Sequence, residues 1–167
     1  MNQRSEALAK RIEQGAAKLA AYAEGLDEKQ WATVVKPDGR TVGVLVHHVA
    51  SMYPIEMQLV LEVGAGKAVE GVTWDVVAEI NAKHAKDYSA VGKREALETL
   101  RRNSQAAADA VRGMTDQQLD SAASFSLNAG APLTAQFVIE DHPLRHAWHH
   151  LARIQANLEA KEPVGAK

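Results

Sequence analysis

TAQFVIEDHPLRHAWHHLARIQANLEA, residues 134–160, carries apolar side chains at every third or fourth position, the spacing of a helix with one buried face. The helix is expected to start near Thr134, and Pro143 interrupts its backbone hydrogen bonds. The segment therefore predicts one long amphipathic helix from about Thr134 to about Ala160. Its expected buried face consists of Leu144, Ala147, Leu151, Ile154 and Leu158.

Three segments nearer the N-terminus show the same periodicity. The first is expected to begin with Ser5 as its N-cap and to end at Gly25. The second spans about residues 41–64 and contains Pro54, which we expect to kink it. The third covers about residues 97–114. The expected core positions are Leu8, Ile12, Leu19, Tyr22 and Leu26 in the first, Leu45, Met52, Ile55 and Leu59 in the second, and Leu97, Leu100, Ala107, Val111 and Met114 in the third.

The connections between these helices are long. Residues 26–40 contain the turn signal Lys36-Pro37-Asp38-Gly39, so we expect a loop with one short helical turn. A glycine-bounded break precedes a shorter helix from about Thr73 to Tyr88. Residues 121–132 are small and uncharged, which favours a crossover loop, and no segment shows the alternation of a strand. The sequence predicts an all-α fold, a four-helix bundle with long connections, as a single domain over residues 1–167 with a frayed tail at 162–167.

The composition excludes several classes of function. Lys and Arg number 19 against 21 Asp and Glu, a net charge of -2 that gives no attraction for nucleic acid or an anionic membrane. The chain has no cysteine, so any metal would be held by histidines and carboxylates. No run of eighteen apolar residues occurs, and the N-terminus lacks an apolar segment. We therefore expect a cytoplasmic protein that binds neither nucleic acid nor a membrane.

Histidine is the residue type that the composition leaves unexplained. Of seven histidines, His47 and His48 are adjacent. On a helical wheel His48 lies within the apolar seam of its helix, whereas His47 turns toward the rim or solvent. His146 and His150 are four residues apart, so both imidazoles can face one ion. Two core-edge histidines on one helix and a core histidine on another would supply three ligands and leave a position open for water or substrate.

Each of these histidines also has an ordinary interpretation. A histidine in an apolar seam is commonly a core residue whose hydrogen bonds are satisfied, and a histidine pair on a helix is also found as surface decoration. His142 and His149 share a polar stripe with Arg153, which suits either the wall of a wet cavity or a solvated helix face. Asp141 faces away from His146 and is not expected to orient it.

The two histidine-bearing segments resemble a known family when they are taken together. Residues 41–50, TVGVLVHHVA, and residues 146–154, HAWHHLARI, resemble the DinB-like (DinB/YfiT) superfamily of metal-dependent enzymes, and the likeness covers nearly the whole chain in length and order of elements. That family is a four-helix bundle with one histidine ligand on the second helix and a histidine pair on the last. The resemblance implies His48, His146 and His150 as metal ligands.

The resemblance also implies a range of reactions. Family members include thiol S-transferases and thiol-dependent maleylpyruvate isomerases, so a divalent metal ion with a low-molecular-weight thiol is the first expectation, and transfer of that thiol to an electrophilic small molecule the first function. A hydrolase that uses a metal-bound water is the alternative. Zn or Ni suits three imidazoles best, and Fe, Mn or Cu would also fit. Members are often homodimers, which the resemblance allows here. A non-catalytic ligand-binding or dimerisation bundle is the alternative of another class.

Two further residues are candidates for a catalytic role. Glu56 lies two turns beyond His48, where the wheel favours a solvated rim carboxylate over a partner for a ligand or a general base. His84 shares an apolar stripe with Val77, Ile80 and Tyr88, so it either lines the pocket or is a core-edge histidine bonded to the backbone.

Overall fold

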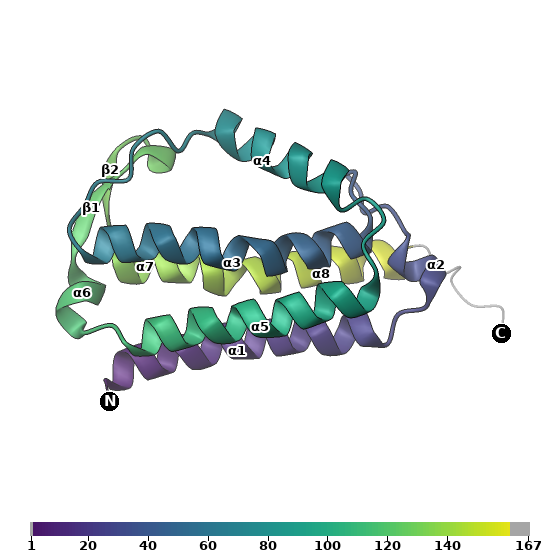
Figure 1. The fold of residues 1–167 in the computed structure, drawn as a ribbon, viewed down its shortest axis with the longest axis horizontal. Helices are drawn as coiled ribbons and strands as arrows, with labels where there is room; N and C mark the ends of the chain where they lie inside the picture. Colours follow the sequence, from purple (N-terminus) through teal and green to yellow (C-terminus); the bar gives the residue numbers. More distant parts are fainter. Residues whose placement is uncertain (1, 161–167) are drawn as a thin grey trace.

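A computed structural model describes residues 2–160, and the predicted fraying of residues 162–167 lies outside this part of the chain. Most of the described chain is helical (Figure 1). The elements are α1 (Gln3–Glu24), α2 (Glu28–Trp31), α3 (Val42–Gly64), α4 (Trp74–Asp87), α5 (Lys93–Arg112), α6 (Asp116–Asp120), β1 (Ala122–Phe125), a 3-10 turn (Ser126–Asn128), β2 (Ala131–Thr134), α7 (Ala135–Ile139), a π-helical turn (Glu140–Leu144) and α8 (Arg145–Glu159).

Four long helices form the predicted bundle. α1 and α5 lie side by side as one pair, and α3 and the α7–α8 helix form the other (Figure 1). α1 and α8 run in one direction, α3 and α5 in the other. Because α3 and α5 are parallel, the chain must return along the bundle between them, and α4 makes that crossover on the outer side of α3 (Figure 1).

Side-chain caps fix the ends of the helices. Thr41, Thr73 and Thr134 accept hydrogen bonds from backbone N–H groups in the first turns of α3, α4 and α7, near the residues where these helices were expected to begin. The prediction of Ser5 as the cap of α1 is wrong, because Asn2 has that role. Ser5 is buried in the first turn, where its hydroxyl donates to the backbone oxygens of Asn2 and Arg112.

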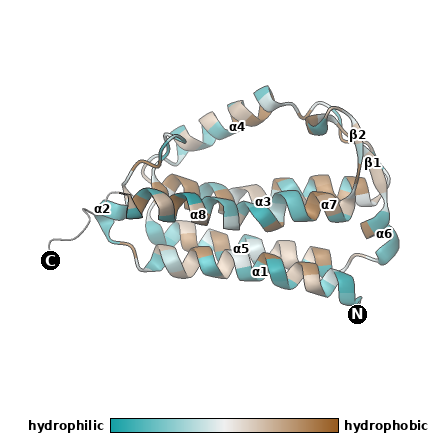
Figure 2. Ribbon diagram, turned by 180° about the vertical axis from the view of Figure 1, so that it is seen from behind, coloured by the Kyte–Doolittle hydropathy of each residue, from teal (hydrophilic) through white to brown (hydrophobic). Residues whose placement is uncertain are grey.

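The bundle core lies where the apolar faces of the helices meet, and hydrophobic and hydrophilic residues alternate around each helix (Figure 2). The predicted faces of α5 and α8 are buried. The predicted seam of α3 is partly wrong. Ile55 is 43% exposed, whereas Tyr53 and Met57 are buried. Every residue from 42 to 50 is buried, because α2 and α4 cover the first half of α3 on the sides away from the bundle.

Only one residue of α4 is buried, and that residue is His84. Trp74 is 69% exposed at the start of the helix. Val76 and Ile80 also keep more than a third of their surface exposed. The crossover helix is therefore attached to α3 mainly through its C-terminal half, around His84.

Residues 122–134 contain a small two-stranded sheet where a crossover loop was expected over residues 121–132. β1 and β2 pair antiparallel, with Ala122 opposite Thr134 and Phe125 opposite Ala131. Phe125 is fully buried and forms an isolated bridge with Val69. The short strand AASF has small side chains and one aromatic residue, so its two-residue alternation is too weak to recognise without its partner.

The last helix has the predicted limits but is not a uniform α-helix. Residues 140–144 form a π-helical turn around Pro143, which lacks the backbone N–H for the regular ladder. Pro54, by contrast, produces no π-helical turn in α3. It lies on the exposed side of this helix, which is assigned as continuous α-helix from Val42 to Gly64. Within residues 2–160, no helix combines the length and the apolar character required to cross a membrane.

Candidate metal centre

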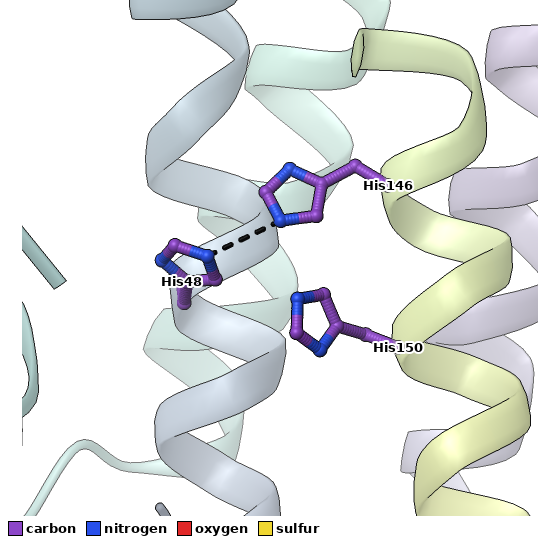
Figure 3. Close-up of side chains that lie close together, drawn as sticks. All are labelled: His48, His146 and His150. Carbon is purple, nitrogen blue, oxygen red and sulfur yellow. Dashed lines mark hydrogen bonds between the residues drawn. The ribbon is translucent and has the colours of Figure 1, made fainter. Parts of the chain in front are cut away.

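Three histidines from two helices meet inside the bundle. His48 projects from α3, and His146 and His150 project from successive turns of α8 (Figure 3). Each ring offers a nitrogen, and the three nitrogens all lie within 4.8 Å of one another. His48 and His150 are buried and His146 is nearly so. We call these residues the histidine cluster.

The spacing of the cluster suits a transition-metal ion. Nε2 of His146 lies 3.2 Å from Nε2 of His48. Two nitrogens bound to zinc at about 2.0–2.1 Å in tetrahedral geometry are separated by about 3.3 Å. The ring centroids of the other two pairs, His48 with His150 and His146 with His150, are 5.4 and 4.9 Å apart. The donor set is purely imidazole nitrogen, which suits Zn, Ni, Cu or Fe(II) better than Mg or Ca.

Burial keeps the imidazoles neutral. The pKa of His48 is far below its usual range, because burial and then the charges of His146 and Arg40 disfavour the protonated ring. The same causes, in the same order, lower the pKa of His150 to about 2. A neutral ring keeps the lone pair that a metal ion requires, so these two residues are ready to bind a cation at ordinary pH.

Glu56 contacts the cluster, against the expectation of a solvated carboxylate. It is only 9% exposed, and its Oε1 lies 2.8 Å from Nδ1 of His146. Nδ1 is the ring nitrogen that faces away from His48, so Glu56 stands behind His146 and not among the three converging nitrogens. A carboxylate in this place selects the tautomer with the proton on Nδ1 and frees Nε2 as a ligand. Its geometry supports an orienting role and not that of a general base.

A second pair of histidines lies against the cluster from the side of α4. Nδ1 of His47 is 2.9 Å from Nε2 of His84, and the ring of Tyr88 stacks on both. The prediction that His47 faces the rim or solvent is therefore wrong, because α4 covers it and leaves it 3% exposed. His84 bonds another side chain and not the backbone, and its ring centroid is 5.5 Å from that of His48. It therefore lines the site.

An arginine approaches the cluster from the loop before α3. Nε and Nη2 of Arg40 donate to the two carboxylate oxygens of Asp38 at 2.6 and 2.8 Å. After burial and the charge of a neighbouring histidine, the charge of Arg40 contributes to lowering the pKa of His48, His84 and His150. Burial opposes ionisation of Asp38, but the hydrogen bond from Arg40 prevails and lowers the pKa of this carboxyl.

The remaining candidate residues lie apart from the three converging nitrogens. His142 stacks on Phe125 at 5.8 Å, and His149 is exposed with its Nε2 3.5 Å from Arg153. Asp141 forms an ion pair with Arg145, in agreement with the expectation that it does not orient His146.

Unpaired polar atoms gather at this site. Among the described residues, the buried side-chain nitrogens and oxygens that make no hydrogen bond all belong to the histidine cluster or its neighbours. His146 Nδ1 is among them but has the carboxylate contact described above. Buried polar groups are normally paired, so this concentration of unpaired donors and acceptors indicates a site that binds a polar ligand or ion. The atoms are Arg40 Nη1, His48 Nδ1, Tyr53 OH, Glu56 Oε2, His84 Nδ1, His146 Nδ1 and His150 Nδ1.

Sequence reasoning missed Arg40, Asp38 and Tyr53. One signal for Arg40 was present, since it directly precedes Thr41, the cap of α3. The positive end of the helix dipole disfavours a cation at this position, so an arginine there indicates a role other than stabilising the helix. For Tyr53 no signal existed, because the wheel placed the core of α3 on a different face.

The fold and the site define a helical bundle with a buried three-histidine group, and comparison with known proteins places this bundle in a family. The sequence model of the DinB superfamily matches residues 11–154. The chain belongs to the DinB superfamily.

Among solved structures, the chain is similar to YfiT from Bacillus subtilis, with a TM-score of 0.75 and 20% sequence identity over 96% of this chain and 89% of that one. YfiT is described as a probable metal-dependent hydrolase with an unusual four-helix bundle topology. At this identity the likeness shows the fold. No curated protein sequence matches the chain.

Proposed function

We propose that this protein is a divalent-metal-dependent enzyme in which His48, His146 and His150 hold the ion. The observation that carries the proposal is the convergence of three buried imidazole nitrogens within 4.8 Å of one another. The low pKa values of His48 and His150 support it, because a purely structural histidine cluster does not need every ring to present a free lone pair.

A bound divalent ion would lower the pKa of a water or thiol and so supply a nucleophile near neutral pH without a protein sulfur. The chain's own residues would prepare the site for this chemistry. Glu56 holds the ring of His146 so that Nε2 faces the other two histidines. His47 and Tyr88 pack on His84 and close the site on the side of α4.

We propose hydrolysis of a small molecule as the first reaction class. It needs only water as a nucleophile, and the fold relative YfiT is described as a probable metal-dependent hydrolase. Transfer of a low-molecular-weight thiol to an electrophile is the second candidate. A chain without cysteine is compatible with both reactions, because neither needs a protein sulfur. Both reactions take a small-molecule substrate.

The first experiment is elemental analysis of protein prepared without a histidine tag. We expect one Zn or Ni ion per chain in the wild type and loss of the ion in His48→Ala and His146→Ala. His149→Ala is the matched control, because His149 lies on the same helix but is exposed. A wild type without stoichiometric metal, together with a His146→Ala variant unchanged in stability and metal uptake, would refute the metal centre.

The second experiment separates the two reactions. Metal-loaded protein is given a panel of small esters and amides, and separately 1-chloro-2,4-dinitrobenzene with and without an added thiol. Turnover of the panel without thiol supports hydrolysis. Consumption of the chloroarene only when thiol is present supports thiol transfer. In either case His48→Ala is expected to lower the rate at least about a hundredfold, since the ion supplies the nucleophile.

A further inference from the structure

An arginine with unused donors lies in the loop before α3, where it shares Asp38 with Arg153, the residue three positions after His150 on α8. Nε and Nη2 of Arg40 are both occupied by Asp38. Nη1 is buried, and no hydrogen-bond partner for it occurs among residues 2–160. The side chain is only 14% exposed, so solvent has little access to this end of the guanidinium. A buried cationic donor without an acceptor is costly, and a bound anion would supply the acceptor that it lacks.

The surroundings of Arg40 give this end of the site a positive charge. Nη1 of Arg153 lies 3.8 Å from Oδ2 of Asp38, so two guanidinium groups share one carboxylate. Arg153 follows His150 by three residues on α8, whereas Glu56 contacts His146 one turn earlier. The site therefore has a cationic end near His150 and an acidic end near His146.

The stability of α3 does not explain why an arginine occupies this position. Arg40 directly precedes Thr41, the N-cap, where the positive end of the helix dipole opposes a cation. Asp38 offsets that repulsion but uses only one edge of the guanidinium. The free edge matches the geometry with which arginine binds a carboxylate or phosphate group.

We propose that Arg40 is the anion-binding residue of the site, and that its Nη1 donates to an oxygen of a carboxylate or phosphate group on the substrate. The inference rests on the proposed function and specifies its substrate class, a small molecule with an oxyanion group at one end and the reacting bond next to the histidine cluster. Asp38 is a positioning residue, because its two charge-assisted hydrogen bonds fix the plane of the guanidinium.

Anion binding can be measured without the metal. Tag-free protein treated with a chelator is titrated with inorganic phosphate or with sodium acetate, and its unfolding temperature is compared with that in sodium chloride of the same ionic strength. A specific site raises the unfolding temperature above the chloride value with a saturating concentration dependence. The two anions distinguish a phosphate-bearing substrate from a carboxylate-bearing one, and saturation by either supports the proposal.

Arg40→Lys keeps the charge but removes the planar fork, and we expect it to raise the dissociation constant of the bound anion about tenfold. Arg112→Lys is the matched control, because Arg112 also pairs with carboxylates but has a partner on each of its three nitrogens. It should bind the anion as the wild type does. Equal shifts in chloride and in both oxyanions, or wild-type affinity in Arg40→Lys, would overturn the proposal.

A measurement on the wild type covers the case in which Arg40→Lys does not fold. The side-chain Nε resonance of Arg40 in nitrogen-15 spectra should move on addition of the anion, while that of Arg112 stays in place. No movement at Arg40 overturns the proposal. The metal test is independent, because anion binding in protein that fails to retain metal would refute the metal-dependent function and leave the anion site standing.

Discussion

Glu56 shows how one carboxylate organises the histidine cluster. Its Oε1 lies 2.8 Å from Nδ1 of His146, and its side chain is buried against the bundle. Among the three candidate ligands in the described chain, His146 is the one with a carboxylate within ion-pair distance. Orientation of the cluster therefore depends mainly on this residue.

Glu56→Gln tests that dependence. The amide keeps the size of the side chain but removes the charge that favours a proton on Nδ1 of His146, so we expect zinc affinity to fall about 10- to 100-fold. The measurement is competition against a chromogenic chelator, with circular dichroism to verify the fold. Glu62→Gln, on the same helix and hydrogen-bonded to Gln58 away from the cluster, is the control. Equal affinity of the two variants would contradict the orienting role.

The candidate ligands could be predicted from local sequence, while their partners could not. His146 and His150 are one turn apart at the edge of the core on the same helix, and His48 lies in an apolar seam, so spacing and the family resemblance together indicate these three. The environments of His47 and Glu56 depend on what covers α3 from outside. A helical wheel assumes a single buried face, but α4 buries the opposite side of residues 42–50 as well.

At the scale of elements, α2 fixes the start of α3 and with it the loop that carries Arg40. Trp31 of α2 is buried, and its Nε1 donates to the backbone oxygen of Val91 just before α5. Its ring also lies against Gly43 in the first turn of α3. One tryptophan thus connects three helices. The packing position of Trp31 could not be predicted from the sequence, because it depends on a glycine twelve residues away in another helix.

Gly43→Ala tests whether Gly43 makes room for the Trp31 ring. A Cβ at residue 43 would lie 2.5 Å from Nε1 of Trp31, so α2 must move or Trp31 must leave its place. We expect the free energy of unfolding to fall by about 1–3 kcal/mol, the usual cost of overpacking, as measured by urea denaturation. Gly25→Ala is the control, because its Cβ would meet only ordinary contacts. Equal stability of the two variants would show that Trp31 is not held by Gly43.

At the scale of the whole molecule, the bundle has a polar interior next to an apolar one. The α1–α5 side of the core is built from leucines, alanines and other apolar side chains, whereas the space between α3, α4 and α8 holds His47, His48, His84, His146 and His150. The order of the helices was predictable from periodicity and loop lengths. The full polar layer was not, because His47 and His84 join the other three histidines only when the crossover helix folds back over α3. A homodimer stays a prediction of the family resemblance.

This polar layer makes the stability of the metal-free protein dependent on pH. Burial lowers the pKa of His48 far below its usual range, of His84 to about 4 and of His150 to about 2, whereas in the unfolded chain each titrates near about 6.5. Below pH about 6.5 the unfolded state therefore binds more protons than the folded state. The contribution of these histidines to the free energy of unfolding is complete above pH about 6.5. It falls as the pH decreases toward the pKa values of the folded state, by up to about 1.4 kcal/mol per pH unit for each histidine.

Urea unfolding of chelator-treated protein between pH 8 and pH 5 measures this slope. We expect stability to be flat above pH 7 and to decrease steeply below pH about 6.5. In His84→Gln the slope between pH about 6.5 and 5 should be shallower by the contribution of one histidine, because glutamine does not titrate. A stability that stays constant down to pH 5 would mean that the buried histidines take up protons as readily in the bundle as in the unfolded chain, and that the layer is not the desolvated group of neutral imidazoles described above.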